Sequence, residues 1–519
     1  MSAETIGLVM IFGTVAIATM VGLASRLGVR KMTMEQWTVG GRSFGQVLIW
    51  VLMAGEIYTT FTFLGESGWA YSRGAAAFYI LAYCTVAFIL SYFVMVPVWR
   101  AGRRFGFVTN ADLFSHRFDS RWLGVLVAVI GVIYVIPYLV LQLTGLGIII
   151  NIASYGAISP KVAIVIGFVA TSLFVLVSGL RATAWVGVLK DVTLIVAVVV
   201  FGLLLPIHYF GGVGSMFRAL EHAHPGHMTF PVAGQPQYSS LWYFSTVLLT
   251  GCGFYMWPHL FSATYSARSG DSIKRNSILL PFYQLGLLFP LFVGFTALLI
   301  IHPRLSDPDS SFLSIVQSTF PPGALGFVGA AGVLAAMVPA SALLLTACTL
   351  IVRNIYSPVF RHGKRDTQAG RSSEDQMVAR WARILVPVIT AIALYFALVS
   401  SKSLVALLLL GYDGVTQFFV GVVLGMFWRG ANKVSVGCGL LVGEILVAWL
   451  VLSGHDPVFG LNAGFAALIA NIMVTVCAGL VTQHYDAAPA RSYYPESDDA
   501  AARLSTGTDP AAAAQRGQV

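Results

Sequence analysis

Six ionisable side chains lie inside long apolar runs of the sequence, where burying a charge is costly and usually marks a function. They are Glu56, Glu66, Lys190, Asp191, Asp413 and Glu444. Lys190 is the only cation of the set. A buried ammonium could titrate, take the place of a bound cation or attract an anionic solute, whereas a lysine near an interface could simply snorkel to it. Glu56 lies deep in its run and is expected to be functional, while Glu66 and Glu444 lie near the ends of theirs.

Residues that interrupt helices are the second indication of a functional site. Solute transporters bind their cargo near the middle of the membrane, where broken helices free backbone groups. The candidate interruptions are Ala54-Gly55, Gly251-Cys252-Gly253 and Pro339. Glycine in membrane helices often serves close packing. Pro339 is therefore the stronger local signal, because proline removes a backbone donor and frees a carbonyl.

The elements that carry these residues are predicted to be membrane-spanning helices. The 519 residues are 57% hydrophobic and 10% charged, against about 25% charged in soluble domains. Apolar runs long enough to cross a bilayer recur along the chain and must be helical, because lipid cannot satisfy a bare backbone. We predict an all-α polytopic membrane protein with about thirteen spans, near residues 4–24, 46–71, 75–99, 122–150, 160–179, 183–209, 241–262, 278–301, 324–350, 380–400, 403–427, 434–453 and 461–482.

The basic residues predict the orientation of these spans. With the N-terminus outside and the C-terminus inside, 25 of the 31 Lys and Arg residues fall in inner segments and 5 in outer loops. This bias is what the positive-inside rule requires. We therefore expect a transmembrane domain over residues 1–482, in the cytoplasmic membrane of a bacterium. Residues 483–519, rich in Ala, Asp, Ser and Pro, are expected to form a disordered cytoplasmic tail.

Other chemistries find little support. The formal charge of +9 would suggest nucleic-acid binding in a soluble protein, but the positive residues lie in short loops on one side. The five cysteines lie in apolar runs without metal-binding or redox spacing, so neither disulfides nor a metal site is predicted. The outer-loop cluster Glu221, His222, His224 and His227 resembles a metal site superficially but lacks a scaffold. No enzyme motif appears, so we expect no enzyme activity and no cofactor.

Several segments in order resemble the sodium/solute symporter family, over essentially the whole chain. They are Trp37–Ser43 (WTVGGRS), Phe63–Tyr71 (FLGESGWAY), Ser178–Trp185 (SGLRATAW) and Ala335–Tyr356, which ends in RNIY. The resemblance implies a leucine-transporter-type inverted repeat, with spans 2–6 and 7–11 as the two repeats and spans 1, 12 and 13 outside them. It also implies a symporter that works by alternating access.

The cation site implied by this resemblance departs from the family pattern. In the family, sodium is held by span 2 carbonyls, which match Gly55 and Tyr58 here, and by two hydroxyl side chains of span 9. Those hydroxyl positions hold Val338 and Pro339, which offer no side-chain oxygen, unless a one-residue shift brings in Ser341. The family's W-T-D-x-x-Q motif has become Trp185–Lys190, with Gly187 for the carboxylate and Lys190 for the glutamine. We hypothesise that Lys190, beside Asp191, replaces the ion or couples transport to protons.

Within the family, Trp185–Asp191 and Met256–His259 are most similar to the monocarboxylate permease branch. This similarity implies pyruvate, lactate, acetate or a similar acid as the solute. A small carboxylate also suits a buried Lys190, because an anion in a low dielectric needs a positive partner. The candidate pocket residues are Glu56, Tyr58, Thr59 and Thr62 in span 2, Tyr83 in span 3, and Trp242, Phe244 and Tyr255 in span 7.

Three alternatives stay open. The first is a sodium-coupled symporter for an amino acid, pantothenate or another organic acid. The second is a transporter-like membrane sensor, although the short tail offers no signalling domain. The third is a channel, although no filter motif repeats along the chain. Beyond the solute and the lipid bilayer, we expect no nucleic-acid partner and no obligate protein partner.

Overall fold

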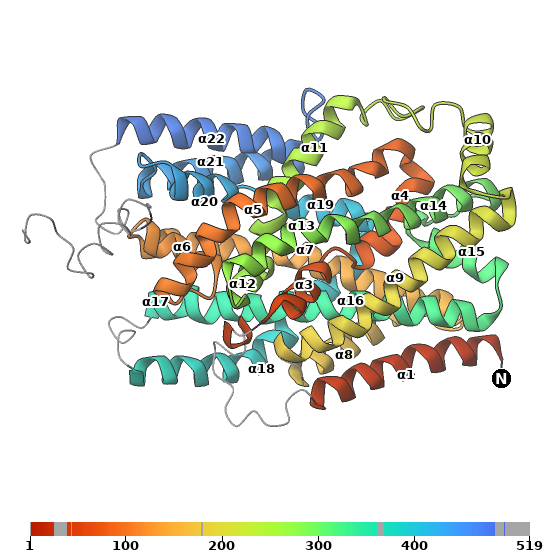
Figure 1. Ribbon diagram of the computed structural model, residues 1–519, viewed down its shortest axis with the longest axis horizontal. Coiled ribbons are helices and arrows are strands. Elements are labelled where there is room, and N and C mark those ends of the chain that lie inside the picture. Colours follow the sequence, from red (N-terminus) through yellow and green to blue (C-terminus); the bar gives the residue numbers. More distant parts are fainter. Residues whose placement is uncertain are drawn as a thin grey trace, which may run out of the picture.

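The computed structural model describes residues 2–24, 39–42, 44–177, 180–360, 368–482 and 493. This part of the chain is helical and contains no β-strand. Its long helices run side by side along the long axis of the molecule (Figure 1). Nine helical stretches within these ranges are long and apolar enough to cross a membrane. The all-helical fold predicted from the apolar runs is confirmed.

Helical segments correspond to each of the thirteen predicted spans. In chain order they are α1 (Ala3–Ala24), α3 (Gln46–Ala54) with α4 (Glu66–Arg73), α5 (Tyr79–Phe105), α7 (Arg121–Ala153), α8 (Pro160–Val177), α9 (Leu180–Phe210), α11 (Ser240–Gly253) with α12 (Pro258–Ser266), α13 (Gly270–Gln284) with α14 (Leu288–Ile300), α16 (Pro322–Thr349), α18 (Gln368–Val399), α19 (Leu404–Val415) with α20 (Phe418–Phe427), α21 (Lys433–Leu452) and α22 (Ala463–Val481). Shorter helices connect them: α6 (Asn110–Arg117), α10 (Val213–Ala223), α15 (Ser311–Thr319) and α17 (Ser357–Phe360).

Span 2 is broken between α3 and α4. The helix ends at Ala54, and a π-helical turn over Phe61–Gly65 precedes α4. The Thr62 hydroxyl bonds the Ile57 carbonyl at 2.9 Å and accepts the Thr59 amide at 3.0 Å. A threonine side chain that binds the backbone in this way competes with the helical ladder. The predicted interruption at Ala54-Gly55 is therefore present, and it frees carbonyl groups in the middle of the span.

Span 7 is broken just after the predicted interruption, in the four residues that follow Gly253. The helix α11 runs through the predicted Gly251–Gly253 interruption, and the break lies in a 3-10 turn over Phe254–Met256 and in Trp257. Trp257 has ψ of 129°, and Pro258 begins α12. A residue before proline avoids the helical region, while proline itself suits the first turn of a helix.

Pro339 does not interrupt span 9, which corrects the prediction. The helix α16 continues from Pro322 to Thr349 with Pro339 inside it. Almost every residue of α16 from Leu325 onward is buried, and the helix packs against α1, α7 and α9. Dense packing on all sides holds the helix through the proline, because neighbouring helices restrain the kink that a proline would otherwise favour.

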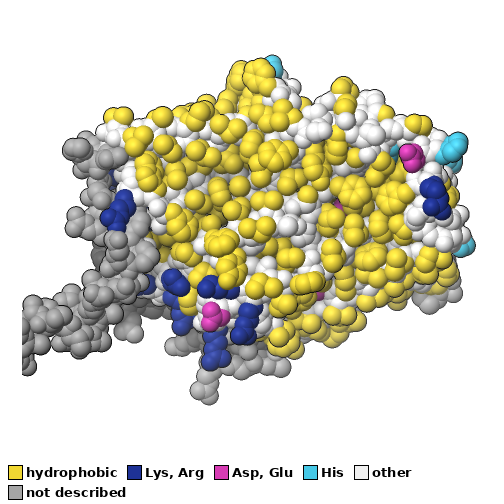
Figure 2. Space-filling model, turned by 45° about the horizontal axis from the view of Figure 1, so that its top comes forward, with side chains coloured by type: hydrophobic (Ala, Val, Ile, Leu, Met, Phe, Trp, Pro, Cys, Tyr) yellow, Lys and Arg dark blue, Asp and Glu magenta, His cyan; other side chains and the backbone are white. Residues whose placement is uncertain are grey.

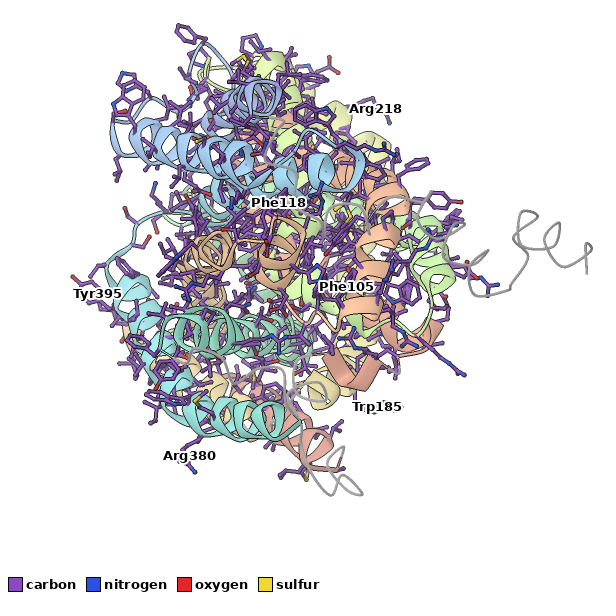
Figure 3. The ribbon with its side chains drawn as sticks, turned by 90° about the vertical axis from the view of Figure 1, so that its left-hand side faces the viewer. Phe105, Phe118, Trp185, Arg218, Arg380 and Tyr395 are labelled. Carbon is purple, nitrogen blue, oxygen red and sulfur yellow. The ribbon has the colours of Figure 1, made fainter. Side chains whose placement is uncertain are left out.

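The outer surface has the character of a membrane protein. Figure 2 shows a broad hydrophobic face, with most of the visible Lys and Arg side chains toward one end and most of the visible His side chains toward the other. In the view along the bundle (Figure 3), Trp185 and Tyr395 lie at its periphery, and they are 48% and 63% exposed. Side chains of this kind on the outside of a helical bundle face lipid. Which end faces the cytoplasm stays a prediction.

The predicted tail lies outside the described residues except for Tyr493. The Tyr493 hydroxyl lies 2.7 Å from His116 Nδ1 on α6. Its ring is 5.5 Å from that of Phe105 at the end of α5, and the Arg117 guanidinium lies over it at 5.7 Å. One point of the tail therefore contacts the end of the bundle where α5 and α6 meet.

Candidate functional site

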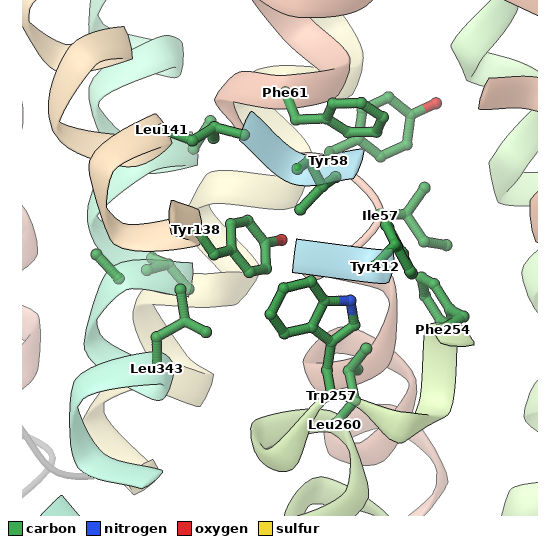
Figure 4. Close-up of a cluster of buried hydrophobic side chains, with 14 of the residues drawn as sticks. Ile57, Tyr58, Phe61, Tyr138, Leu141, Phe254, Trp257, Leu260, Leu343 and Tyr412 are labelled. Atoms are coloured by element: carbon green, nitrogen blue, oxygen red, sulfur yellow. The ribbon is translucent and has the colours of Figure 1, made fainter. Parts of the chain in front are cut away.

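The breaks in spans 2 and 7 meet in the interior of the bundle. Figure 4 shows Tyr138 of α7 and Trp257 of span 7 directed toward the interruption of span 2, beside Ile57 and Tyr412. The Tyr138 and Trp257 ring centroids are 4.9 Å apart, and those of Trp257 and Tyr412 are 5.5 Å apart. Aromatic rings from three spans thus surround the non-helical backbone in the interruption of span 2.

Glu56 and His259 connect the two broken spans. His259 Nε2 lies 3.0 Å from Glu56 Oε2, and both side chains are almost completely buried. His259 Nδ1, on the other side of the ring, has no hydrogen-bond partner among the described residues. Buried polar atoms are normally paired, so this nitrogen is available to a bound solute. Sequence reasoning placed Glu56 at the site but missed His259, although a histidine directly after Trp257-Pro258 in an apolar run was a usable signal.

Lys190 projects from α9 into the break of span 2. Its ammonium donates to the carbonyl oxygen of Gly55 and, at 2.9 Å, to that of Tyr58. Asp191 Oδ1 lies 3.1 Å from the same nitrogen, and the lysine side chain is fully buried. Lys190 therefore does not snorkel to an interface. It lies against the two backbone positions that the family resemblance assigns to a sodium site.

The span 9 positions complete the surroundings of Lys190 without supplying side-chain oxygens. A Cβ placed on Gly187 would lie 3.4 Å from Val51 Cγ1 and 3.9 Å from Val338 Cγ1, so Gly187 fits between spans 2 and 9. The Val338 and Pro339 side chains are buried and apolar. The nearby Ser341 hydroxyl donates to the Val338 carbonyl at 2.8 Å, and it lies 2.8 Å from the Thr183 hydroxyl. The hydroxyl groups of Ser341 and Thr183 thus bind each other.

The other predicted pocket residues divide into two groups. Tyr83 and Trp242 belong to a stack of aromatic rings on the α4 side of the break, where Tyr83 is 5.9 Å from Tyr412 and Trp242 is 5.9 Å from Trp69. Tyr255 is buried in the span 7 break. Phe244 is 57% exposed on the outer surface of α11 and does not join the site.

The remaining span 2 residues support the break itself. Thr59 and Thr62 are fully buried in it. The Tyr58 hydroxyl donates to the Tyr283 carbonyl at 3.1 Å, while its own backbone carbonyl accepts from Lys190. Of the other ionisable residues, Glu444 accepts a hydrogen bond from Tyr134 at 2.8 Å. Glu66 and Asp413 are buried at other levels of the bundle.

Comparisons with known proteins find symporters and a related transport permease. Residues 37–443 match the family model described as the sodium:solute symporter family. An uncharacterized symporter of Bacillus subtilis, YhjB, is 43% identical over 498 residues, covering 93% of this chain and 98% of the relative. A monocarboxylate transport permease protein of Rhizobium johnstonii is 29% identical, covering 85% and 89%. In fold, the chain is similar to a Na+-coupled sialic acid symporter, with a TM-score of 0.72 at 18% identity, over 93% of this chain and 98% of that one.

Proposed function

The chain belongs to the sodium:solute symporter family, and from that premise we propose that it takes up a small monocarboxylate with the Lys190 ammonium in the place of the coupling sodium ion. The solute would be an acid such as pyruvate, lactate or acetate. The observation that carries the proposal is the contact of Lys190 with the Gly55 and Tyr58 carbonyls.

The residues around these carbonyls do not fit a sodium ion. A hard cation requires several oxygen ligands, but Val338 and Pro339 provide none from their side chains, and the two span 2 carbonyls already accept from Lys190. A second positive charge about 4 Å from the ammonium would be repelled by about 4 kcal/mol at an effective dielectric constant of about 20. The Asp191 carboxylate beside the ammonium offsets part of this repulsion, so the occupation of the two carbonyl ligands by Lys190 is the larger obstacle to a sodium ion. These contacts support a site in which the lysine takes the place of the ion that the family name implies.

A fixed ammonium can still support coupling. When protonated, Lys190 ties α9 to the break in span 2 and balances the charge of Asp191. If it lost its proton, the neutral amine would keep two N–H donors for the three acceptors around it and would no longer pair with Asp191 by charge, so the tie between the two helices would weaken. A cycle in which Lys190 binds a proton on one side of the membrane and releases it on the other would therefore couple proton movement to alternating access. The proposal thus favours proton-coupled or sodium-independent uptake.

The choice of a carboxylate rests on two further observations. The Lys190 ammonium supplies positive charge in a dry interior, and the unpaired Nδ1 of His259 becomes a donor when the imidazole is protonated. An anion gains most from such partners where water is excluded. The monocarboxylate permease relative supports the same class of solute. The competing proposal is a sodium-coupled symporter for an amino acid, pantothenate or another organic acid, and the Na+-coupled fold relative favours it.

Uptake into proteoliposomes tests the proposal. The purified protein is reconstituted and offered labelled pyruvate, lactate, acetate or proline, with a proton gradient or a sodium gradient imposed separately. We expect at least one monocarboxylate to accumulate under the proton gradient in sodium-free buffer, and proline to stay at the level of protein-free liposomes. Accumulation of proline alone, or of any solute only when sodium is present, contradicts the proposal.

A further inference from the structure

A cavity lies outside the central site, at the end of the bundle that carries α10. Its volume is about 450 Å³, and its polar lining consists of Tyr71, Ser72, His224, His227, Gln235 and Arg304. Figure 2 shows histidine, basic and acidic side chains gathered at this end, beyond the hydrophobic face. Sites for small molecules have volumes of about 300–1,000 Å³, so this cavity is large enough for a small organic ion with some water.

The cavity walls are anchored to the end of span 2. His227 Nε2 lies 3.1 Å from the Ala70 carbonyl, and the His227 carbonyl accepts from Ala75 at 2.9 Å. The Gln235 side chain donates to the Ser72 carbonyl at 2.9 Å. On the opposite wall, the Leu305 amide donates to the Tyr71 hydroxyl at 2.9 Å. Two segments distant in sequence, the loop with His227 and Gln235 and the loop with Leu305, are thus held around α4 by hydrogen bonds, which makes the cavity a formed structure rather than a gap between loops.

The charge of the cavity is positive. Arg304 makes no ion pair with any described carboxylate, and no residue that lines the cavity is Asp or Glu. Arg73 lies beside it and donates to Gln235 at 2.6 Å. The acidic residues nearby are Glu221 on α10, which is exposed, and Asp307, whose carboxylate accepts the Asp309 amide at 3.1 Å.

The two histidines respond to this environment. Their ring centroids are 6.1 Å apart. Burial lowers the pKa of His224, and the charges of Arg304 and His302 lower it further. Burial also lowers the pKa of His227; the hydrogen bond to the Ala70 carbonyl opposes this, and the charges of His224 and Arg304 lower the pKa further. Both rings are therefore mostly neutral at neutral pH, and a bound anion would favour their protonation.

We propose that this cavity is a binding site for a small carboxylate anion, with Arg304 as the ionic anchor and His224 and His227 as the further donors. The site is separate from the central one. The choice of a carboxylate over another anion rests on the proposed function, since it makes the transported solute the natural occupant. The histidine cluster of the outer loop, which superficially resembled a metal site in the sequence, thus acquires a partner in Arg304 from a distant loop.

The site predicts a specific dependence on pH. Because anion binding raises proton affinity at His224 and His227, proton binding raises anion affinity by the same factor. Affinity for the carboxylate should therefore increase as the pH falls from about 8 to about 6. An anion held by Arg304 alone would show no such change, because arginine stays charged throughout this range.

A cysteine in the wall reports on the site without any need for transport. Ala233 is exposed and lines the cavity, so Ala233→Cys is made in a protein whose exposed Cys438 and Cys477 are replaced by alanine. The rates of labelling by an anionic and a cationic methanethiosulfonate are compared. We expect the anionic reagent to be favoured, increasingly so toward pH 6, and lactate but not lactamide to slow the labelling.

Two substitutions give the controls. Arg304→Gln should lower the ratio of anionic to cationic labelling about five-fold and abolish protection by lactate. Arg218→Gln removes the same charge from α10 outside the cavity lining, and it should change neither. Equal protection by lactamide, no protection by lactate, or equal effects of the two substitutions overturns the proposal. Because labelling reads binding directly, failure of lactate uptake through the central site would leave this result interpretable.

Discussion

Replacing Lys190 by methionine removes its charge and its hydrogen-bond donors while keeping a long unbranched side chain in the same space. The change leaves the Gly55 and Tyr58 carbonyls without their donor. It also leaves Asp191, whose carboxylate lies 3.1 Å from the ammonium, buried without its partner. Because the lysine is fully buried, solvent cannot substitute for any of these contacts.

The size of the effect follows from these losses. Removing one member of a buried ion pair costs about 3–5 kcal/mol, and an unpaired buried acceptor costs about 1–3 kcal/mol. A loss of about 3 kcal/mol from the transporting state corresponds to about a 100-fold fall in uptake. We therefore expect Lys190→Met to lower both the thermal unfolding temperature in detergent and the uptake of labelled lactate by proteoliposomes.

Two further variants separate charge from packing. Lys190→Met with Asp191→Asn removes both charges, so it should recover part of the thermal stability without recovering uptake. Lys161→Met changes an exposed lysine and should alter neither measurement. Wild-type uptake by Lys190→Met would refute the reasoning, since the ammonium would then be a packing residue. An unchanged stability of Lys190→Met would refute the part that assigns it a buried ionic contact.

Three other changes test separate parts of the account. Glu56 and His259 lie 3.0 Å apart, so Glu56→Gln and His259→Gln together should reduce uptake by less than the sum of the two single effects, with a coupling energy of about 0.5–3 kcal/mol in a double-mutant cycle. Strictly additive effects would contradict a direct interaction. Burial, with help from the charge of Asp307, raises the pKa of Asp309 in the loop before α15 to about 8. Folding then favours the protonated form, so thermal stability should fall as the pH rises from about 4 to about 8; Asp309→Asn should flatten this slope, and an unaltered slope would exclude Asp309 as its source. Tyr493→Ala removes the contact with His116 and should lower the unfolding temperature by the equivalent of about 1 kcal/mol; an unchanged unfolding temperature would show that this contact does not stabilise the protein.

Much of the fold could be predicted from the sequence because lipid imposes one strong rule. Every apolar run long enough to cross the bilayer must be a helix, so the spans followed from hydropathy. The break at Ala54-Gly55 was also visible. The continuity of span 9 through Pro339 was not, because it depends on packing by α1, α7 and α9, which no local pattern encodes.

The candidate site was predictable where it depended on local motifs and not where it depended on distant pairs. The proximity of Lys190 to Gly55 and Tyr58 could be expected from two motifs of a resembling family. The pairing of Glu56 with His259, 203 positions apart, required the two helix breaks to be placed in space. Phe244 was predicted to line the pocket because it is aromatic, but it lies on the outward face of α11 and is exposed. Arg304 and the outer-loop histidines likewise line one cavity, although they lie in segments far apart in sequence, so no local pattern could have brought them together.

The most direct test of the central claim is sodium binding itself. Equilibrium binding of radioactive sodium to the purified protein should show no saturable site in the wild type, because the Lys190 ammonium occupies the span 2 carbonyls. Lys190→Ala, which vacates that position beside the Asp191 carboxylate, is expected to gain sodium binding that the wild type lacks. Saturable sodium binding by the wild type, unchanged in Lys190→Ala, would contradict the account.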